Sequence, residues 1–224
     1  MTDDDFNREL ELAQKLFPGL DPEARTGLAR YAVLLRDWNS RVNLVSRKET
    51  DLLMAHHIAP AVAIAAFWTP KPGARVLDIG TGGGLPGMPL AILSPELRFL
   101  LVDSVGKKTK AVQAMLRELG LRHAEGRQAR AETLTERFDL VVGRAVAAFP
   151  RLLAWAKPRL RRDPGCGVYY IKGTLYRDEL ASVGLEPDAV WPLREVLAGD
   201  YYADKFVVHL EASTIARCRR LPTG

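Results

Sequence analysis

A glycine-rich segment in the middle of the chain has the composition of a ligand-binding loop. It reads VLDIGTGGGLPG over residues 76–87, and Gly80, Gly82 and Gly84 can adopt the positive φ that lets the backbone approach a ligand closely. The spacing Gly82-x-Gly84-x-x-Gly87 also fits the dinucleotide fingerprint, which is a weak signal when it stands alone. The segment therefore predicts a cofactor site and leaves the cofactor open.

Asp78, two residues before Gly80, narrows the choice of cofactor. A carboxylate at this position would repel a nearby pyrophosphate, but it suits the ammonium group of an amino acid, reached directly or through water. S-adenosylmethionine carries such a group and a nicotinamide dinucleotide does not. We therefore expect S-adenosylmethionine as the cofactor and no metal. The alternative role for this acid is capping or hydrogen bonding within the loop.

Further candidate ligands follow the neighbouring strands. The stretch RFLLVDS (98–104) ends in Asp103 and Ser104, and an acid at the end of a second strand can accept hydrogen bonds from both ribose hydroxyls. Ala131 and Glu132 follow a weaker third strand, where the adenine edge would be read. All these residues are expected at the carboxyl ends of strands, where doubly wound sheets bind their ligands.

The elements that must position these residues alternate between strands and helices after residue 73. Strands are expected at 75–80, 98–104, 122–128, 138–146, 168–173 and 205–211, and helices at 89–93, 107–119 and 150–160. Such alternation predicts a doubly wound, mostly parallel sheet. The last strand follows a turn-rich stretch in which we expect no helix, so it should pair antiparallel with its neighbour.

The first 72 residues are expected to form an N-terminal helical extension. Apolar residues recur at helical spacing over 6–17, Asp21 and Pro22 begin a helix that runs through Trp38, and a helical stretch over 48–68 is interrupted or kinked at Pro60. The segment TPKPG (69–73) marks a boundary. We therefore divide the chain into the extension (1–72), a cofactor-binding domain (73–212) and a basic tail (213–224).

Composition is that of an ordinary globular protein, with 47% hydrophobic and 26% charged residues. Cys166 and Cys218 stand far apart and can build neither a disulfide framework nor a zinc site. The acidic first residues lack the apolar stretch of a signal peptide, and the longest apolar run (58–68) is too short to span a bilayer. We therefore expect a cytoplasmic monomer with no membrane partner.

The net charge is +5, and the basic excess lies in residues 73–224. Basic residues cluster within 157–162 and 217–220, where they could attract a polyanion or form an ordinary solvated surface. Lys107 and Lys108 begin an expected helix, where cations oppose the helix dipole, which favours an RNA-binding role. Lys172, at the end of the fifth strand, is a further RNA-binding candidate.

These motifs resemble the RsmG (also called GidB) family of small-subunit ribosomal RNA methyltransferases. The resemblance runs from Asn43 to about Glu211. Its most specific segments are DIGTGGGLPGMPLAI (78–92), LVDSVGKKTK (101–110) and GRAVA (143–147). The resemblance implies a class I, Rossmann-like methyltransferase fold with a seven-stranded, mostly parallel sheet and an antiparallel last strand. It also implies methylation of guanine N7 (guanine 527 in the usual numbering) in the decoding-region loop of 16S rRNA, as free RNA or within the small ribosomal subunit or its precursor.

By the same resemblance, Gly80, Leu85, Ala131, Glu132 and Arg144 match cofactor-contacting positions. The family often shows a His-x-x-Asp-Ser-like stretch before the first strand, where this chain has HHIAPA (56–61). No role of that acid is therefore carried over. His56 and His57 could line the substrate entrance or serve a structural role.

Methylation at guanine N7 needs no general base, because N7 has a free lone pair at neutral pH. The protein's task is to align N7, the methyl carbon and sulfur, and such positioning can supply roughly 7–11 kcal/mol. GRAVAAFP (143–150) accordingly lacks the Asn/Asp-Pro-Pro-aromatic motif of exocyclic amine methylation, and Cys166 is misplaced for attack on a pyrimidine.

Arg144 is the candidate positioning residue. A sulfonium would repel its guanidinium, so we expect Arg144 to hold the donor's carboxylate or an RNA phosphate. A surface salt bridge is the alternative.

Phe149 could stack on the flipped guanine or pack its helix.

Three other function classes compete with this interpretation. An NAD(P)-dependent oxidoreductase gains support from Tyr201-x-x-x-Lys205, the spacing of a short-chain dehydrogenase pair. That pair needs a helix that places both side chains on one face. Lys205 instead opens an expected strand, so the geometry should fail. A small-molecule methyltransferase and a non-catalytic RNA-binding protein are the other two.

Overall fold

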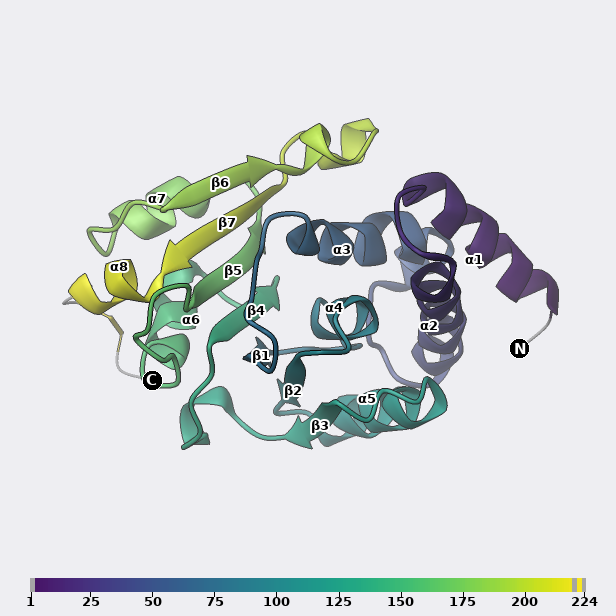
Figure 1. Cartoon of the computed structure of the whole chain (residues 1–224), viewed down its shortest axis with the longest axis horizontal. Helices are drawn as coiled ribbons and strands as arrows, with labels where there is room; N and C mark the ends of the chain where they lie inside the picture. The colour runs from purple at the N-terminus through teal and green to yellow at the C-terminus, as the bar shows by residue number, and fades with distance from the viewer. Residues whose placement is uncertain (1–2, 219–220, 223–224) are drawn as a thin grey trace.

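One mixed sheet organises the residues that the computed structural model describes, which are 3–218 and 221–222. Its strands are β1 (Arg75–Ile79), β2 (Arg98–Asp103), β3 (Ala124–Gln128), β4 (Leu140–Arg144), β5 (Gly167–Lys172), β6 (Ala189–Pro192) and β7 (Phe206–Glu211). Their order is β3-β2-β1-β4-β5-β7-β6, and β7 runs antiparallel to both of its neighbours (Figure 1). The expected class I fold with an antiparallel last strand is confirmed.

Helices cover both faces of this sheet. On one face α4 (Gly87–Leu93) and α5 (Gly106–Glu118) pack with the helices of the extension, against strand residues such as Val76 and Leu101. On the other face α6 (Phe149–Ala156), α7 (Tyr176–Ala181) and α8 (Ala212–Arg217) pack against residues such as Leu77 and Val141. Adjacent strand residues thus enter opposite cores, as the period-2 geometry of a strand requires.

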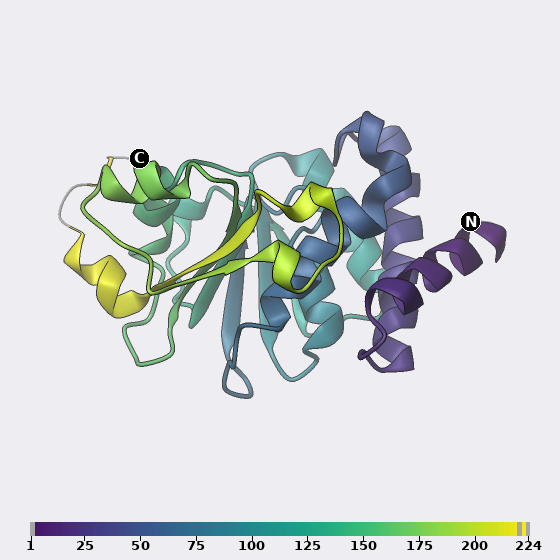
Figure 2. The ribbon, with the colours of Figure 1, turned by 90° about the horizontal axis from the view of Figure 1, so that it is seen from above.

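The extension consists of α1 (Asp3–Leu16), α2 (Pro22–Arg41) and α3 (Ala59–Ala65), of which α1 and α2 lie at the end of the molecule opposite α8 (Figure 2). Asp21 caps α2 as expected, since its Oδ1 accepts a hydrogen bond from Ala24 N at 2.8 Å. Leu28, Tyr31 and Leu35 of α2 are fully buried in the same core as β1 and α4. The extension therefore shares its core with the sheet.

The chain between α2 and α3 departs from a regular helix. A 3-10 helix (Arg47–Leu52) leads into a π-helix (Leu53–Ile58), and Pro60 lies in the first turn of α3. The interruption that we expected at Pro60 thus falls just before it. Because proline has no N–H, it cannot bond the carbonyl of Ala55 or His56, four or five residues earlier.

Two elements of the C-terminal half were missed. We expected no helix between the fifth strand and the last, yet α7 and the edge strand β6 lie there. Both are too short, at six and four residues, for a periodic pattern to reveal them.

The segment that we expected to be a basic tail begins with a helix. α8 buries Ile215 in the sheet's second core, and Lys157 Nζ donates to the carbonyls of Ala216 and Cys218, the latter at 2.7 Å. Arg219 and Arg220 of the expected basic cluster lie outside the described residues. Across the described part of the chain, no helix has the length and hydrophobicity needed to cross a membrane.

Candidate cofactor and acceptor site

The glycine-rich loop has the backbone conformation that its sequence predicts. Gly80, Gly82 and Gly84 have φ of +67°, +57° and +100° between the end of β1 and the start of α4. Tyr31 of the extension donates a hydrogen bond to the carbonyl of Gly83 at 3.0 Å, and Leu85 is buried. The extension therefore packs directly on the loop and helps to fix its shape.

Asp78 lies fully buried behind this loop. Its Oδ2 accepts hydrogen bonds from Thr81 Oγ1 at 2.6 Å and from Gly87 N at 2.9 Å. Its Oδ1 is buried without a hydrogen-bond partner among the described residues. Burial raises the pKa of Asp78 to about 7. The acid thus holds the loop, which was the alternative role, and also keeps one acceptor oxygen for a donor such as an ammonium group.

Asp103 joins the end of β2 to the glycine loop. Its Oδ2 accepts from Gly82 N at 3.0 Å and its Oδ1 from Val105 N at 2.8 Å. The residue lines a pocket of about 380 Å³ at the carboxyl ends of β1, β2 and β4. Five of the residues predicted to bind the cofactor line this pocket together: Gly80, Asp103, Ser104, Ala131 and Glu132.

The turn after β4 forms the far wall of the same pocket. Ala145 has a φ of +51°, which is uncommon for a residue with a side chain and marks local strain. The buried hydroxyl of Tyr170 accepts hydrogen bonds from the backbone N–H groups of Val146 and Ala147, both at 3.1 Å, and donates to the Ala147 carbonyl at 2.8 Å. Tyr170 therefore holds the turn in this conformation.

Arg144, the last residue of β4, bonds to the extension. Its Nη2 donates to the carbonyl of His56 at 2.9 Å and its Nη1 to that of His57 at 3.1 Å. Burial lowers the pKa of this guanidinium. We expected the two arms of the guanidinium to bind the donor's carboxylate or an RNA phosphate. In this structure they bind two backbone carbonyls instead.

A polar cluster that the sequence did not reveal surrounds this contact. The carboxylate of Glu49 lies 3.4 Å from His56 Nδ1 and 3.0 Å from His57 Nε2. The ring of His56 stacks on that of Tyr201, with ring centroids 3.5 Å apart and nearly parallel planes. The cluster therefore joins the extension to the segment between β6 and β7, beside the end of β4.

The predicted RNA-binding lysines fall into two groups. Lys107 is exposed at the start of α5, and Lys108 lines the cofactor pocket. Lys172 instead pairs with Glu179, Nζ to Oε1 at 2.6 Å. An RNA-binding role for Lys172 would require this ion pair to open.

Phe149 packs its helix and does not face solvent. It is fully buried and meets Tyr170 edge to face, with ring centroids 5.2 Å apart. The idea that it stacks on a flipped base is wrong for this structure, because its ring is fully buried in the core.

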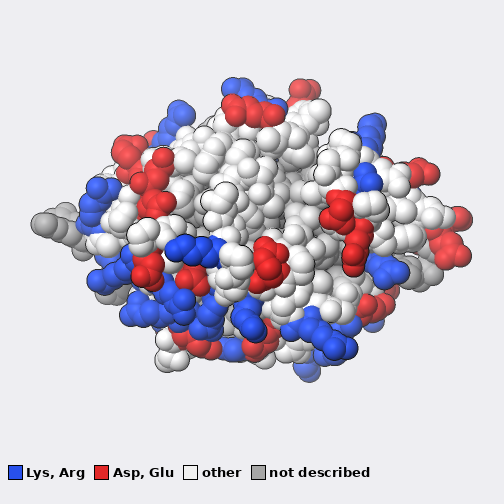
Figure 3. All heavy atoms as spheres, viewed as in Figure 1, with Lys and Arg blue, Asp and Glu red and all other residues white. Residues whose placement is uncertain are grey.

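Part of the basic cluster at 157–162 has an internal role. Arg159 donates hydrogen bonds to the carbonyls of Leu134, at 3.1 Å, and Glu132. It therefore supports the loop that carries Ala131 and Glu132. Other Lys and Arg side chains gather along the lower margin of the face in Figure 3, whose middle carries few charges.

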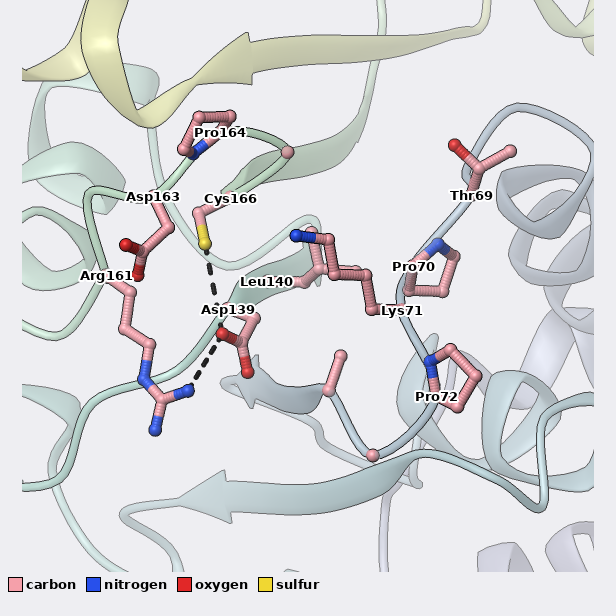
Figure 4. Close-up of a pocket in the computed structure, with 13 residues that line it drawn as sticks. Thr69, Pro70, Lys71, Pro72, Asp139, Leu140, Arg161, Asp163, Pro164 and Cys166 are labelled. Atoms are coloured by element: carbon pink, nitrogen blue, oxygen red, sulfur yellow. Dashed lines mark hydrogen bonds and ion pairs between the residues drawn. The ribbon is translucent and has the colours of Figure 1, made fainter.

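A second pocket, of about 310 Å³, lies at the opposite edge of the sheet, beside the amino ends of β1, β4 and β5. Figure 4 shows Asp139, Arg161 and Cys166 turned toward one another there, with Arg161 Nη1 3.1 Å from Asp139 Oδ1. Burial raises the pKa of the Cys166 thiol, which disfavours the reactive thiolate. Since doubly wound sheets bind ligands at their carboxyl edge, this pocket is not the cofactor site.

Tyr201 and Lys205 do not form a dehydrogenase pair. Tyr201 belongs to a short 3-10 turn and Lys205 directly precedes β7, so no α-helix carries both. Lys205 Nζ lies over the Tyr201 ring at 3.8 Å from its centroid, a cation–π contact. The expectation from the sequence that no helix carries both residues is confirmed.

Comparison with known proteins shows the family to which this chain is similar. The family model described as "GidB: rRNA small subunit methyltransferase G" matches residues 25–186. A ribosomal RNA small subunit methyltransferase G of Christiangramia forsetii is 37% identical over 205 residues, which cover 90% of this chain and 96% of the relative. The protein of that name from Chlorobaculum tepidum is 48% identical over 164 residues, covering 72% of this chain and 74% of the relative.

Solved structures of low sequence identity share the fold. Fibrillarin of Aeropyrum pernix, in complex with natively bound S-adenosyl-L-methionine, aligns with a TM-score of 0.50 at 19% identity over 67% of this chain and 72% of its own. A SAM-dependent methyltransferase from Aquifex aeolicus aligns with a TM-score of 0.51 at 16% identity over 70% of this chain and 91% of its own. These likenesses bear on the fold alone.

Proposed function

Because the chain belongs to the GidB family of small-subunit rRNA methyltransferases, we propose that it methylates 16S rRNA with S-adenosylmethionine, at N7 of a guanine in the decoding-region loop. One observation of the site carries the choice of cofactor. Three strand ends converge on one pocket, with Asp103 in its wall and an unpartnered oxygen of Asp78 behind the glycine loop. These acceptors fit ribose hydroxyls and an amino-acid ammonium group.

The same hydrogen bonds argue against a dinucleotide. In a dinucleotide site the loop and the helix N-terminus present free N–H groups to the pyrophosphate. Here Gly82 N donates to Asp103 and Gly87 N donates to Asp78, so carboxylates already occupy these donors. A pyrophosphate would meet two acidic side chains, which disfavours the oxidoreductase alternative.

When bound, S-adenosylmethionine supplies an electrophilic methyl group. In the proposed mechanism Asp103 orients the ribose, and the loop of Ala131 and Glu132 holds the adenine edge. The Ala145–Ala147 turn, which Tyr170 fixes, borders the side of the pocket that we assign to the acceptor base. No residue has to remove a proton, because N7 attacks with a free lone pair. The chain's contribution is then alignment and exclusion of water.

Two measurements test this proposal in sequence. S-adenosylhomocysteine, and not NADH, should raise the melting temperature of the protein, because only a ligand that binds the native state stabilises it. Labelled methyl groups should then pass to 16S rRNA in small subunits from a strain that lacks the gene. Stabilisation by NADH alone, or transfer to no rRNA, would contradict the proposal.

We further propose that the protein acts as a cytoplasmic monomer. Size-exclusion chromatography with light scattering tests the oligomeric state.

A further inference from the structure

The segment 49–57 is fixed to the end of β4 and to the chain between β6 and β7 by an unusual set of hydrogen bonds. Three successive carbonyls of the π-helix accept from side chains far away in the sequence. Tyr202 Oη donates to Ala55 O at 2.7 Å, Tyr201 Oη to His56 O at 3.2 Å, and Arg144 to the carbonyls of His56 and His57.

Pro60 explains why one of these carbonyls is available. Without an N–H, Pro60 cannot close the helical bond to Ala55 or His56, so a buried carbonyl needs another donor. Arg144, Tyr201 and Tyr202 supply those donors. Arg144 is followed in the chain by Ala145 and Val146, which line the pocket, so its two hydrogen bonds tie the end of segment 49–57 to the strand end that carries this part of the pocket wall.

Glu49 is the anionic group of this segment. Its side chain keeps 32% of its surface exposed while it contacts both histidines. Partial burial opposes ionisation, but the neighbouring His57 and His56 rings lower the pKa of Glu49, so the group is ionised at neutral pH. Burial and Arg144 lower the pKa of His57 to about 4, so that ring is neutral. An ionised, partly exposed carboxylate thus lies in the segment that Arg144 ties to the pocket wall, and among the described residues it forms no ion pair with a lysine or an arginine.

We propose that Glu49 is the residue that selects guanine, by accepting hydrogen bonds from N1–H and the exocyclic N2 amino group of the acceptor base. This inference rests on the proposed function. Guanine is the base whose Watson–Crick edge places two donors side by side, whereas adenine, cytosine and uracil each present a single donor next to an acceptor. A carboxylate offers only acceptors, so it pairs fully with guanine and poorly with the others.

Charge transfer in the reaction gives the same contact a second role. As the N7 lone pair forms the bond to the methyl carbon, the carbon–sulfur bond breaks and its electron pair stays on sulfur. The positive charge therefore passes from sulfur to the purine ring, and N1–H becomes more acidic. A hydrogen bond from N1–H to Glu49 strengthens as this happens, so it stabilises the transition state more than the bound substrate.

The test compares guanosine and inosine monophosphates, since inosine lacks only the N2 amino group. The nucleotides are titrated by NMR into the protein loaded with S-adenosylhomocysteine. Wild type should bind guanosine monophosphate roughly tenfold more tightly, the size expected for one hydrogen bond to a charged group, and Glu49→Gln should lose this preference. The control is Asp51→Asn, an exposed acid two residues further on, which should keep it.

A second measurement follows methyl transfer to small subunits. The kcat/KM of Glu49→Gln should fall at least roughly tenfold while its affinity for S-adenosylhomocysteine, and hence its fold, stays unchanged. Wild-type rates in Glu49→Gln, or an undiminished preference for guanosine monophosphate, would overturn the inference. If wild type itself methylates no subunit, the proposed function fails, and the nucleotide titration still decides the role of Glu49.

Discussion

Val146 lies so close to Gly80 that no side chain fits between them. A Cβ built on Gly80 would stand 2.3 Å from Val146 Cγ2 and 3.0 Å from its Cβ. The turn after β4 and the glycine loop after β1 thus touch at the floor of the cofactor pocket. The shape of the pocket depends on this contact, as well as on the positive φ of Gly80.

Gly80→Ala should therefore weaken cofactor binding more than stability alone explains. We expect the affinity for S-adenosylhomocysteine to fall at least roughly tenfold, because Val146 and the turn must move. Gly120→Ala is the matched control, since Gly120 has a similar φ of +71° but nothing within 4 Å of its added Cβ. Isothermal titration calorimetry of both variants checks this, and equal affinities in the two would contradict it.

Asp78 should make stability depend on pH with a particular sign. Its pKa is raised in the folded state from 3.8 to about 7, mainly by burial. The folded protein therefore holds a proton that the unfolded chain releases, so stability is greatest at low pH and is lost as pH rises toward 7.

Between pH 5 and pH 8, the free energy of unfolding of wild type should fall by about 3 kcal/mol relative to Asp78→Asn. Urea unfolding of both proteins across this range measures the difference. Parallel pH curves would show that the carboxyl titrates normally. If the cofactor's ammonium group lies near Oδ1, S-adenosylhomocysteine should also displace a proton from wild type near pH 7, which calorimetry in two buffers detects.

Arg144→Lys should loosen the extension. A lysine can donate to one of the two carbonyls, of His56 or His57, but cannot span both as the guanidinium does. We expect a lower melting temperature, faster amide exchange in 49–58 and at least a roughly tenfold loss of methyl transfer, since one hydrogen bond from a charged group is lost. Full activity together with unchanged exchange would rule out this positioning role.

Arg159→Ala should weaken cofactor binding without changing attraction to RNA. The side chain donates to the carbonyls of Glu132 and Leu134, so its loss should free the loop that we propose to hold the adenine edge. The exposed neighbour Arg162 is the control, and Arg162→Ala should leave the affinity for S-adenosylhomocysteine unchanged. A fall in affinity of several-fold for Arg159→Ala alone is expected, given one or two lost hydrogen bonds. The reverse pattern would contradict the assignment.

The sequence predicts most of the strands, and five residues that line one pocket at their ends, because these signals are local. Gly80 and Asp103 follow apolar strands directly, and the edge at which parallel strands end is fixed by topology. The strand β6 was not predicted because four residues carry too little periodicity. A base-stacking role was considered for Phe149 because its position after a strand does not show that its side chain is buried.

Glu49 and Tyr201 could not be found in the same way. The hydrogen bond of Tyr201 to the His56 carbonyl joins residues 145 positions apart, so no spacing rule links them. The expectation that Lys172 binds RNA overlooked its ion pair with Glu179 for a related reason. Glu179 lies in α7, a helix that the sequence did not lead us to expect. Local patterns predict residues that line the pocket at the strand ends, and tertiary contacts create the cluster of Glu49, His56 and Tyr201.

The most direct test of the central claim is to delete the gene and map 7-methylguanosine in 16S rRNA by reductive strand cleavage. We predict that one cleavage signal in the decoding-region loop disappears in the deletion strain. The wild-type gene should restore it, and the Gly80→Ala gene should not. An unchanged cleavage pattern in the deletion strain would contradict the assignment of this protein as the methyltransferase for that guanine.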